Sequence, residues 1–193
     1  MPAALILASA SHYRRELLRR LQIPFTVDAA DVDESRAPDE TPLDLVARLA
    51  RAKALRVAAR HPGAWVIGAD QVAVCGAQVL GKPGTAERCI EQLRVASAQT
   101  VTFFTAACLT GGVDVGCTEH VDETQVRFRV LSEAEITRYV ELERPFDCAG
   151  GFKSEGLGIT LMEQIDSRDP TALIGLPLIW LAGALRRAGL SVL

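Results

Sequence analysis

The chain opens with the stretch ALILASASHYRRELLRRL, residues 4–21, which has the pattern of a strand, a tight turn and a helix. The run at 4–8 is wholly apolar, as in a buried strand, and leucines then recur at helical spacing at Leu17, Leu18 and Leu21. Ser11 is placed to cap the helix, because its hydroxyl can accept a hydrogen bond from an unpaired backbone N–H. A strand that leads through a short polar turn into a helix is typical of an α/β fold.

The same alternation continues along the chain. We expect further strands at 25–27, 65–70, 100–109, 113–130 and 159–165, with hairpin arms at 71–75 and 78–80. Helices are predicted to begin near Thr41, Thr85, Ser132 and Pro177. Because no break in composition separates these elements, the sequence predicts one α/β domain over residues 1–193, with a large mixed sheet flanked by helices.

Composition argues against several classes of protein. The formal net charge is only −3, with acids and bases interspersed, whereas a nucleic-acid-binding surface needs clustered basic residues. Apolar runs stay shorter than the ~20 residues that cross a bilayer, and the opening stretch lacks the basic region of a signal peptide. The five cysteines are scattered without a CxxC motif, which favours reduced thiols in the cytoplasm over a disulfide framework or a zinc site.

The turn at 9–11 is a candidate phosphate site. A helix N-terminus offers unpaired N–H groups and partial positive charge, and the Ser9 and Ser11 hydroxyls add donors. Arg14 and Arg15 lie in the first turn of the predicted helix, where cations oppose the helix dipole, so a bound anion is expected there. The alternative is that Ser11 only caps the helix and both arginines are solvated.

Carboxylates supply a candidate metal site. Asp70 ends the apolar strand predicted at 65–70, and in open α/β sheets the carboxyl ends of strands face the ligand crevice. Asp33 and Glu34 lie in an acidic loop and offer the hard oxygen ligands that Mg²⁺ or Mn²⁺ prefers. A turn-capping aspartate and a solvated loop are the alternatives.

Only three of the 21 basic residues are lysines, namely Lys53, Lys82 and Lys153. Lys82 stands between a glycine and a proline, which fix the backbone so that its side chain can be aimed. Lys53 lies on the predicted second helix, where a surface position is the default interpretation. Carboxylates for a divalent ion and cations for a polyphosphate together suit phosphoryl chemistry, whose transition states need positioned positive charge.

These segments together resemble the Maf family of nucleotide pyrophosphatases. The resemblance runs in order from about Leu5 to Gly189 and rests on the following motifs: LASAS at 7–11 with Arg14 and ELL at 16–18, VDE at 32–34, RLA at 48–50 with KA at 53–54, IGADQ at 67–71, GKP at 81–83, AG at 149–150 and GLPL at 175–178. Within the family, CAGGFKSEG at 148–156 and RDP at 168–170 are similar to the branch that acts on 7-methyl-GTP.

The resemblance implies a metal-dependent hydrolase of acid anhydrides, which cuts 7-methyl-GTP into 7-methyl-GMP and diphosphate in a house-cleaning role. It also implies a curved mixed sheet of the Maf/ITPase type with a substrate cleft between two lobes, a requirement for Mg²⁺ or Mn²⁺, and a small-molecule nucleotide as partner. A homodimer is compatible with it. By the same resemblance Asp70 is the proton acceptor, while Tyr13, Gln71 and Glu155 set the choice of substrate.

We therefore assign the candidate site as follows. Asp70 and Glu34 hold the metal, with Asp33 a weaker candidate, and the oxygens of the triphosphate are neutralised by Ser9, Arg14, Lys53 and Lys82. N7-methylguanine is cationic, so it would stack on Tyr13, and Glu155 could accept from its N1–H and amino group. Cys148 stands where other branches have lysine, and Lys153 is expected to lend its charge from the same turn. Ala98 stands where a glycine is common, which puts a tight turn there in doubt.

Two other functions fit the same residues. One is a pyrophosphatase for dTTP and UTP, or for a broad range of modified nucleotides. The other is a nucleotide-binding regulator of cell division that needs no turnover, although the full set of Asp70, Glu34, Lys53 and Lys82 speaks for catalysis.

Overall fold

The structure is a computed structural model that describes residues 4–111 and 116–193. Its strands are β1 (Leu5–Leu7), β2 (Thr26–Val27), β3 (Trp65–Cys75), β4 (Gln78–Leu80), β5 (Thr100–Thr110), β6 (Cys117–Phe128) and β7 (Met162–Ser167). Its helices are α1 (His12–Arg19), α2 (Pro42–Ala58), α3 (Ala86–Ala96), α4 (Glu133–Glu143) and α5 (Leu178–Arg187), with short 3₁₀ turns η1 (Ala149–Gly151) and η2 (Leu157–Leu161). Among these helices, none is both long and apolar enough to cross a membrane.

The strands form one mixed sheet, which confirms the predicted fold class. Their order is β2-β1-β3-β5-β6-β7, and β4 pairs with β3 beside this path. β1 runs parallel to β2 and β3, whereas β4 is antiparallel to β3 and β7 is antiparallel to β6.

Contacts divide the chain into two compact units. The first contains residues 1–70, 105–122 and 169–193, and the second contains 71–104 and 123–168. β3, β5 and β6 each continue from one unit into the other. The single domain over residues 1–193 therefore stays a prediction.

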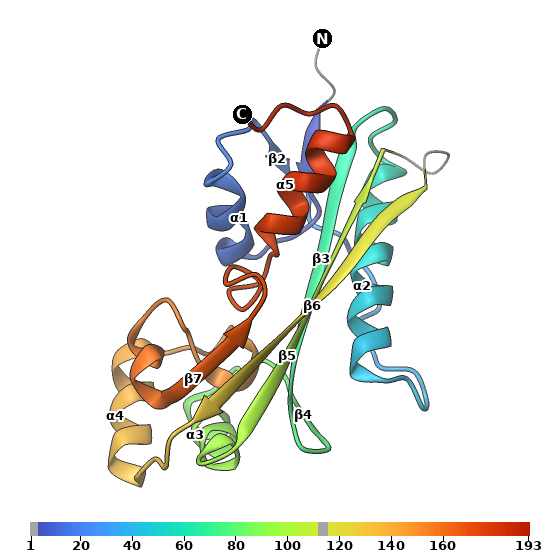
Figure 1. Ribbon diagram of the computed structural model, residues 1–193. Coiled ribbons are helices and arrows are strands. Elements are labelled where there is room, and N and C mark those ends of the chain that lie inside the picture. The colour runs from blue at the N-terminus through green and yellow to red at the C-terminus, as the bar shows by residue number, and fades with distance from the viewer. Residues whose placement is uncertain (1–3, 112–115) are drawn as a thin grey trace. The chain divides into compact units, whose positions relative to one another are not determined.

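The core of the first unit lies on both faces of β1 and β3. Successive side chains of a strand point to opposite faces, so Leu5 and Leu7 pack with leucines of α1 and α5, whereas Ile6 and Ala8 pack with Val57 of α2. Figure 1 shows α1 and α5 on one side of these strands and α2 on the other. This arrangement packs α1 and α2 against opposite faces of the same strands.

The core of the second unit centres on aromatic rings. Phe152 meets Phe103 and Phe128 edge-on, with both pairs of ring centroids 5.3 Å apart. α3 and α4 pack against each other, and α3 also contacts η1. The glycine-rich turn expected at 149–156 is thereby anchored in the core through Phe152, which is 5% exposed.

Several predicted boundaries are wrong. The strand predicted at 65–70 and the hairpin arm at 71–75 form the single strand β3, so Asp70 lies within a strand and not at its end. The strand predicted at 159–165 begins only at Met162, because the chain first turns tightly through η2. A Cβ at Gly158 would lie 2.3 Å from the carbonyl oxygen of Lys153, so the close turn there needs glycine. Of the strand predicted at 113–130, residues 113–115 lie outside the described residues.

Candidate functional site

The predicted phosphate turn is formed at the start of α1. Ser11 caps the helix by accepting a hydrogen bond from the Arg14 backbone N–H at 3.4 Å, as expected. The buried Ser9 hydroxyl accepts from the Ser11 N–H at 3.2 Å and from Arg14 Nη1 at 3.4 Å. Ser9 and Arg14 thus lie together beside a helix N-terminus, which is the arrangement that an anion needs.

A loop from the far end of the chain holds Arg14 in place. Arg14 Nε donates to the Gly175 carbonyl at 2.9 Å. That loop is in turn fixed by Asp169, which is 3% exposed and accepts from the Thr171 hydroxyl at 2.6 Å and from the Ile179 N–H at 2.7 Å. The motifs at 168–170 and 175–178 therefore have a structural role: they hold the Gly175 carbonyl in position to accept from Arg14.

Lys53 is buried between two carboxylates. Its Nζ lies 2.7 Å from Asp70 Oδ1 and 2.5 Å from Glu34 Oε1, and the residue is only 7% exposed. The surface position expected for Lys53 is therefore wrong. Three residues from α2, β3 and the acidic loop, all in the first unit, converge on one point.

Gly68 makes this convergence sterically feasible. A Cβ at Gly68 would lie 2.1 Å from the Ala50 carbonyl oxygen and 2.6 Å from the Ala54 backbone nitrogen. The backbone of α2 therefore touches β3 directly, one turn from Lys53. A close approach of this kind brings the lysine from a helix face into the neighbourhood of Asp70.

Arg14 interacts electrostatically with the two carboxylates beside Lys53, those of Asp70 and Glu34. Burial lowers the pKa of the Arg14 guanidinium, and the charges of Asp70 and Glu34 act in the opposite direction. Two cations and two carboxylates thus share one partly desolvated region, where charges interact more strongly than in water.

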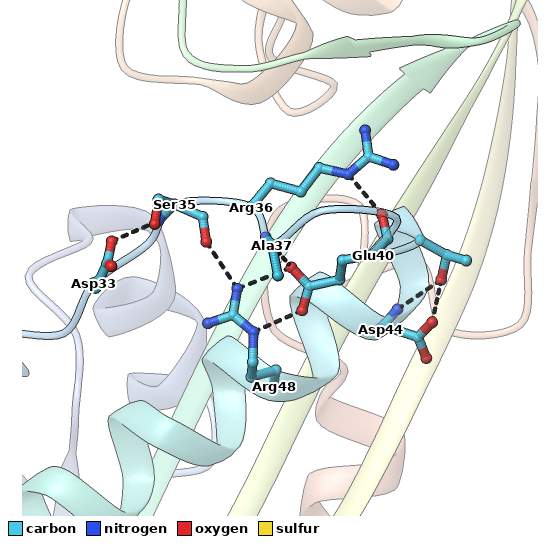
Figure 2. Close-up of polar contacts among 8 residues, drawn as sticks. Asp33, Ser35, Arg36, Ala37, Glu40, Asp44 and Arg48 are labelled. Carbon is cyan, nitrogen blue, oxygen red and sulfur yellow. Dashed lines mark hydrogen bonds and ion pairs between the residues drawn. The ribbon is translucent and has the colours of Figure 1, made fainter.

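The acidic loop before α2 is held by Arg48 (Figure 2). The Arg48 guanidinium donates to both Glu40 carboxylate oxygens, at 2.6 and 2.9 Å, and to the Ser35 carbonyl at 2.9 Å. This hydrogen bonding lowers the pKa of Glu40 to about 2. Asp33 accepts from the Ser35 N–H at 2.9 Å, so it braces the loop that presents Glu34. Glu40 and Arg48 were not predicted in this role, although Arg48 belongs to the RLA motif at 48–50.

Four predicted site residues belong to the second unit: Gln71, Lys82, Lys153 and Glu155. Gln71 directly follows Asp70 on β3, so their side chains point to opposite faces of the strand. Lys82 is exposed, and the carbonyl of the preceding Gly81 accepts from Gln92 at 3.1 Å and from the Gly150 N–H at 3.3 Å. These two hydrogen bonds to the Gly81 carbonyl fix the backbone that leads into Lys82.

The turn that carries Glu155 is anchored on α4. The Lys153 N–H donates to the Tyr139 hydroxyl at 3.0 Å, and Lys153 Nζ lies 3.6 Å from Glu143 Oε1. Glu143 Oε2 accepts from the Leu157 N–H at 2.7 Å. Glu155 itself is exposed between these two fixed points. Lys153 therefore serves the turn structurally, and the charge that the sequence expects it to lend to the substrate stays a prediction.

Comparisons with known proteins agree with these motifs. The family model described as "Maf-like protein" matches residues 4–188. The chain is 52% identical to the 7-methyl-GTP pyrophosphatase of Nitrosococcus oceani over 100% of this chain and 96% of the relative. It is likewise 52% identical to the 7-methyl-GTP pyrophosphatase of Bordetella pertussis, with the same coverage. The Staphylococcus aureus Ham1 protein superposes with a TM-score of 0.46 and 16% identity, over 65% of this chain and 71% of that chain. By its family match and its full-length identity to these relatives, the chain belongs to the Maf family.

Proposed function

We propose that this protein hydrolyses 7-methyl-GTP between its α and β phosphates, releasing 7-methyl-GMP and diphosphate. The observation that carries the proposal is the buried Lys53, whose ammonium lies within 2.7 Å of both Asp70 and Glu34. The names of relatives that are 52% identical over the whole chain support the same reaction and substrate.

The donors around Lys53 fit a divalent cation. Asp70 and Glu34 present carboxylate oxygens close to the same nitrogen, and hard oxygen ligands of this kind suit Mg²⁺ or Mn²⁺. We assign both residues as its ligands. When bound, such an ion supplies positive charge to the phosphate oxygens and lowers the pKa of a coordinated water.

The protein's own residues then have distinct tasks. Asp70, whose Oδ1 lies 2.7 Å from Lys53 Nζ, accepts the proton of the attacking water. Lys53 and Arg14, together with the Ser9 hydroxyl and the N-terminus of α1, neutralise and orient the triphosphate. Lys82 adds a further cation for the leaving diphosphate.

Selection of the base falls to Tyr13, Gln71 and Glu155. An aromatic ring attracts a cationic purine through its face, and a carboxylate pairs better with a cationic base than with a neutral one. The exposed position of Glu155 on an anchored turn supports this role, because the carboxylate is presented by a fixed backbone.

A diphosphate-release assay tests the proposal. Wild-type protein is compared on 7-methyl-GTP, GTP and dTTP, with and without Mg²⁺ or Mn²⁺. We expect metal-dependent release with the highest kcat/KM for 7-methyl-GTP, and Glu155→Gln should shift the ranking toward the other nucleotides. A preference for dTTP would favour the dTTP and UTP alternative, and nucleotide binding without diphosphate release would favour the regulator of cell division.

We place the reaction in the cytoplasm. All five cysteines are free thiols, as is typical of a reducing compartment. The homodimer allowed by the sequence is tested by sedimentation of the purified protein.

A further inference from the structure

Three potential metal ligands meet on β5 and β6, apart from the residues assigned above. The Sγ atoms of Cys108 and Cys117 and a carboxylate oxygen of Glu119 all lie within 4.8 Å of one another. Cys108 is buried, and the other two residues are half-buried. All three belong to the first unit.

Strand pairing explains why these residues meet. β5 and β6 are neighbours in the sheet, and the Thr110 hydroxyl at the end of β5 donates to the Gly116 carbonyl, just before β6, at 2.9 Å. Cys117 and Glu119 are two residues apart on one strand and therefore share a face. The contact joins residues of two strands, so the spacing of the cysteines along the chain does not resemble a CxxC motif.

Arg51 of α2 adds a positive charge beside these three residues. It donates to Glu119 Oε2 at 2.7 Å and makes a second, shorter contact with Oε1, and it interacts electrostatically with both thiols. Burial and a hydrogen bond with Cys117 raise the pKa of Cys108, whereas Arg51 lowers it. Two thiolates and one carboxylate carry three negative charges, which a divalent cation and one guanidinium would neutralise.

We propose that Cys108, Cys117 and Glu119 bind one zinc ion. Two thiolates and one carboxylate oxygen are a ligand set that selects Zn²⁺ over Mg²⁺, and water can complete the tetrahedron. Both thiols lose their protons to solvent when the ion binds. Glu119 has two oxygens, so one can ligate zinc while the other keeps Arg51.

Access to this site is provided by a neighbouring cavity. A space of about 190 Å³ is lined by Glu119 together with small side chains of α2 and β5, including Ala47, Ala50 and Ala106. His120 and Val121 line the same cavity, and the alanines leave space beside them through which a hydrated ion can approach Glu119.

The test uses the full-length protein after removal of bound metals with a chelator. Native mass spectrometry should then show one zinc per chain on titration, and Co²⁺ should give a thiolate-to-metal charge-transfer band. Cys108→Ser and Cys117→Ser should each weaken zinc binding by more than about 100-fold, beyond the cost of losing an outer-sphere partner. Cys148→Ser, a half-buried cysteine elsewhere, is the matched control and should bind zinc as wild type does.

Two further variants separate this site from the proposed catalytic site. Asp70→Asn should bind zinc normally, whatever the outcome for nucleotide hydrolysis. Glu119→Gln keeps a hydrogen-bond acceptor for Arg51 but should weaken zinc binding. The proposal is overturned if the charge-transfer band fails to form, if it survives in Cys108→Ser and Cys117→Ser, or if mild oxidation links the two thiols in a protein that takes up no zinc.

Discussion

The ammonium of Lys53 lies 2.7 Å from Asp70 Oδ1, and both groups are largely shielded from water, with side-chain exposures of 9% and 14%. The pair joins α2 to β3 at the point where α2 touches the strand over Gly68. A lysine that is held this way can stabilise the fold and also present its charge to a polyanion.

Replacing Lys53 by methionine should reduce both stability and turnover. The change leaves two carboxylates without their shared cation, and loss of a hydrogen bond to a charged group costs about 1.5–3 kcal/mol. Chemical denaturation should show this loss, and diphosphate release should fall by at least about 100-fold, as for loss of a group that stabilises transition-state charge. Lys82→Met is the matched control, because Lys82 is exposed: its stability should stay within about 0.5 kcal/mol of wild type. Equal destabilisation of both variants would contradict the burial of Lys53.

Gly68→Ala should displace Lys53, although Gly68 itself has no side chain in the candidate site. Its methyl group would meet the Ala50 carbonyl at 2.1 Å, so α2 must move away from β3 and carry Lys53 with it. We expect a destabilisation of about 1–3 kcal/mol, as for overpacking of a core, and a clear loss of kcat. Gly81→Ala is the control for stability, since its methyl group would meet no atom within 4 Å. An unchanged melting temperature in Gly68→Ala would show that the helix is not pressed against the strand.

Ala98→Gly should stabilise the protein. Ala98 adopts a φ of +58°, so the tight turn that the sequence put in doubt does form, with a residue that has to accept the left-handed region. Relief of that strain is worth about 1 kcal/mol. Thermal unfolding should therefore shift upward, whereas Ala77→Gly, in a turn position without positive φ, should not raise the melting temperature. A lowered melting temperature for Ala98→Gly would refute the strain.

Lowering the pH should weaken the hydrogen bonds of two carboxylates, Glu40 and Glu135, over a defined range. Hydrogen bonds from Arg48 lower the pKa of Glu40 to about 2, and hydrogen bonds from Ser132 at the N-cap of α4 lower the pKa of Glu135 to about 2. Since both pKa values lie below the ordinary 4.5, the stabilisation is complete above about pH 4.5 and is lost as the pH falls toward 2. Glu40→Gln and Glu135→Gln should thus differ most from wild type at neutral pH and converge with it near pH 2. A constant difference in melting temperature across this range would argue against these hydrogen bonds.

Glu143→Gln should change the preference among nucleotides more than it changes the rate of the chemical step. Glu143 accepts from the Leu157 N–H at 2.7 Å and faces Lys153, so it steadies the turn that carries Glu155. With a looser turn, we expect the ratio of kcat/KM for 7-methyl-GTP to that for GTP to fall several-fold, while kcat on 7-methyl-GTP changes less than KM. Glu141→Gln, an exposed change on the same helix, should leave the ratio as it is. If kcat alone fell in Glu143→Gln, the turn would not be setting recognition.

The sequence predicts the fold well where the signal is local. The apolar run at 4–8, the Ser11 cap and the leucines of α1 are determined by neighbours within a few residues, and the structure confirms them. It fails at Lys53, whose burial depends on the contact between Gly68 and a helix about 15 residues earlier in the chain. A surface lysine and a buried one have the same helical spacing, so periodicity cannot separate them.

Two further features also lie beyond local patterns. Glu40 and Arg48 form their ion pair across the start of α2, where a solvated acidic loop was the obvious interpretation of the sequence. Cys108 and Cys117 meet through strand pairing, and neither their number nor their spacing indicates it. The motifs shared with the Maf family supplied the candidate site residues, but the contacts that hold Lys53, Arg14 and Glu34 in place come from the three-dimensional structure.

Hydrolysis of 7-methyl-GTP in ¹⁸O-labelled water, followed by mass spectrometry of both products, tests the assigned chemistry most directly. If water attacks the α-phosphorus with Asp70 as proton acceptor, the label enters 7-methyl-GMP in the wild type, and Asp70→Asn forms almost none of this product although it remains folded. Label in the diphosphate, or labelled 7-methyl-GMP formed by Asp70→Asn at the wild-type rate, would contradict the assignment.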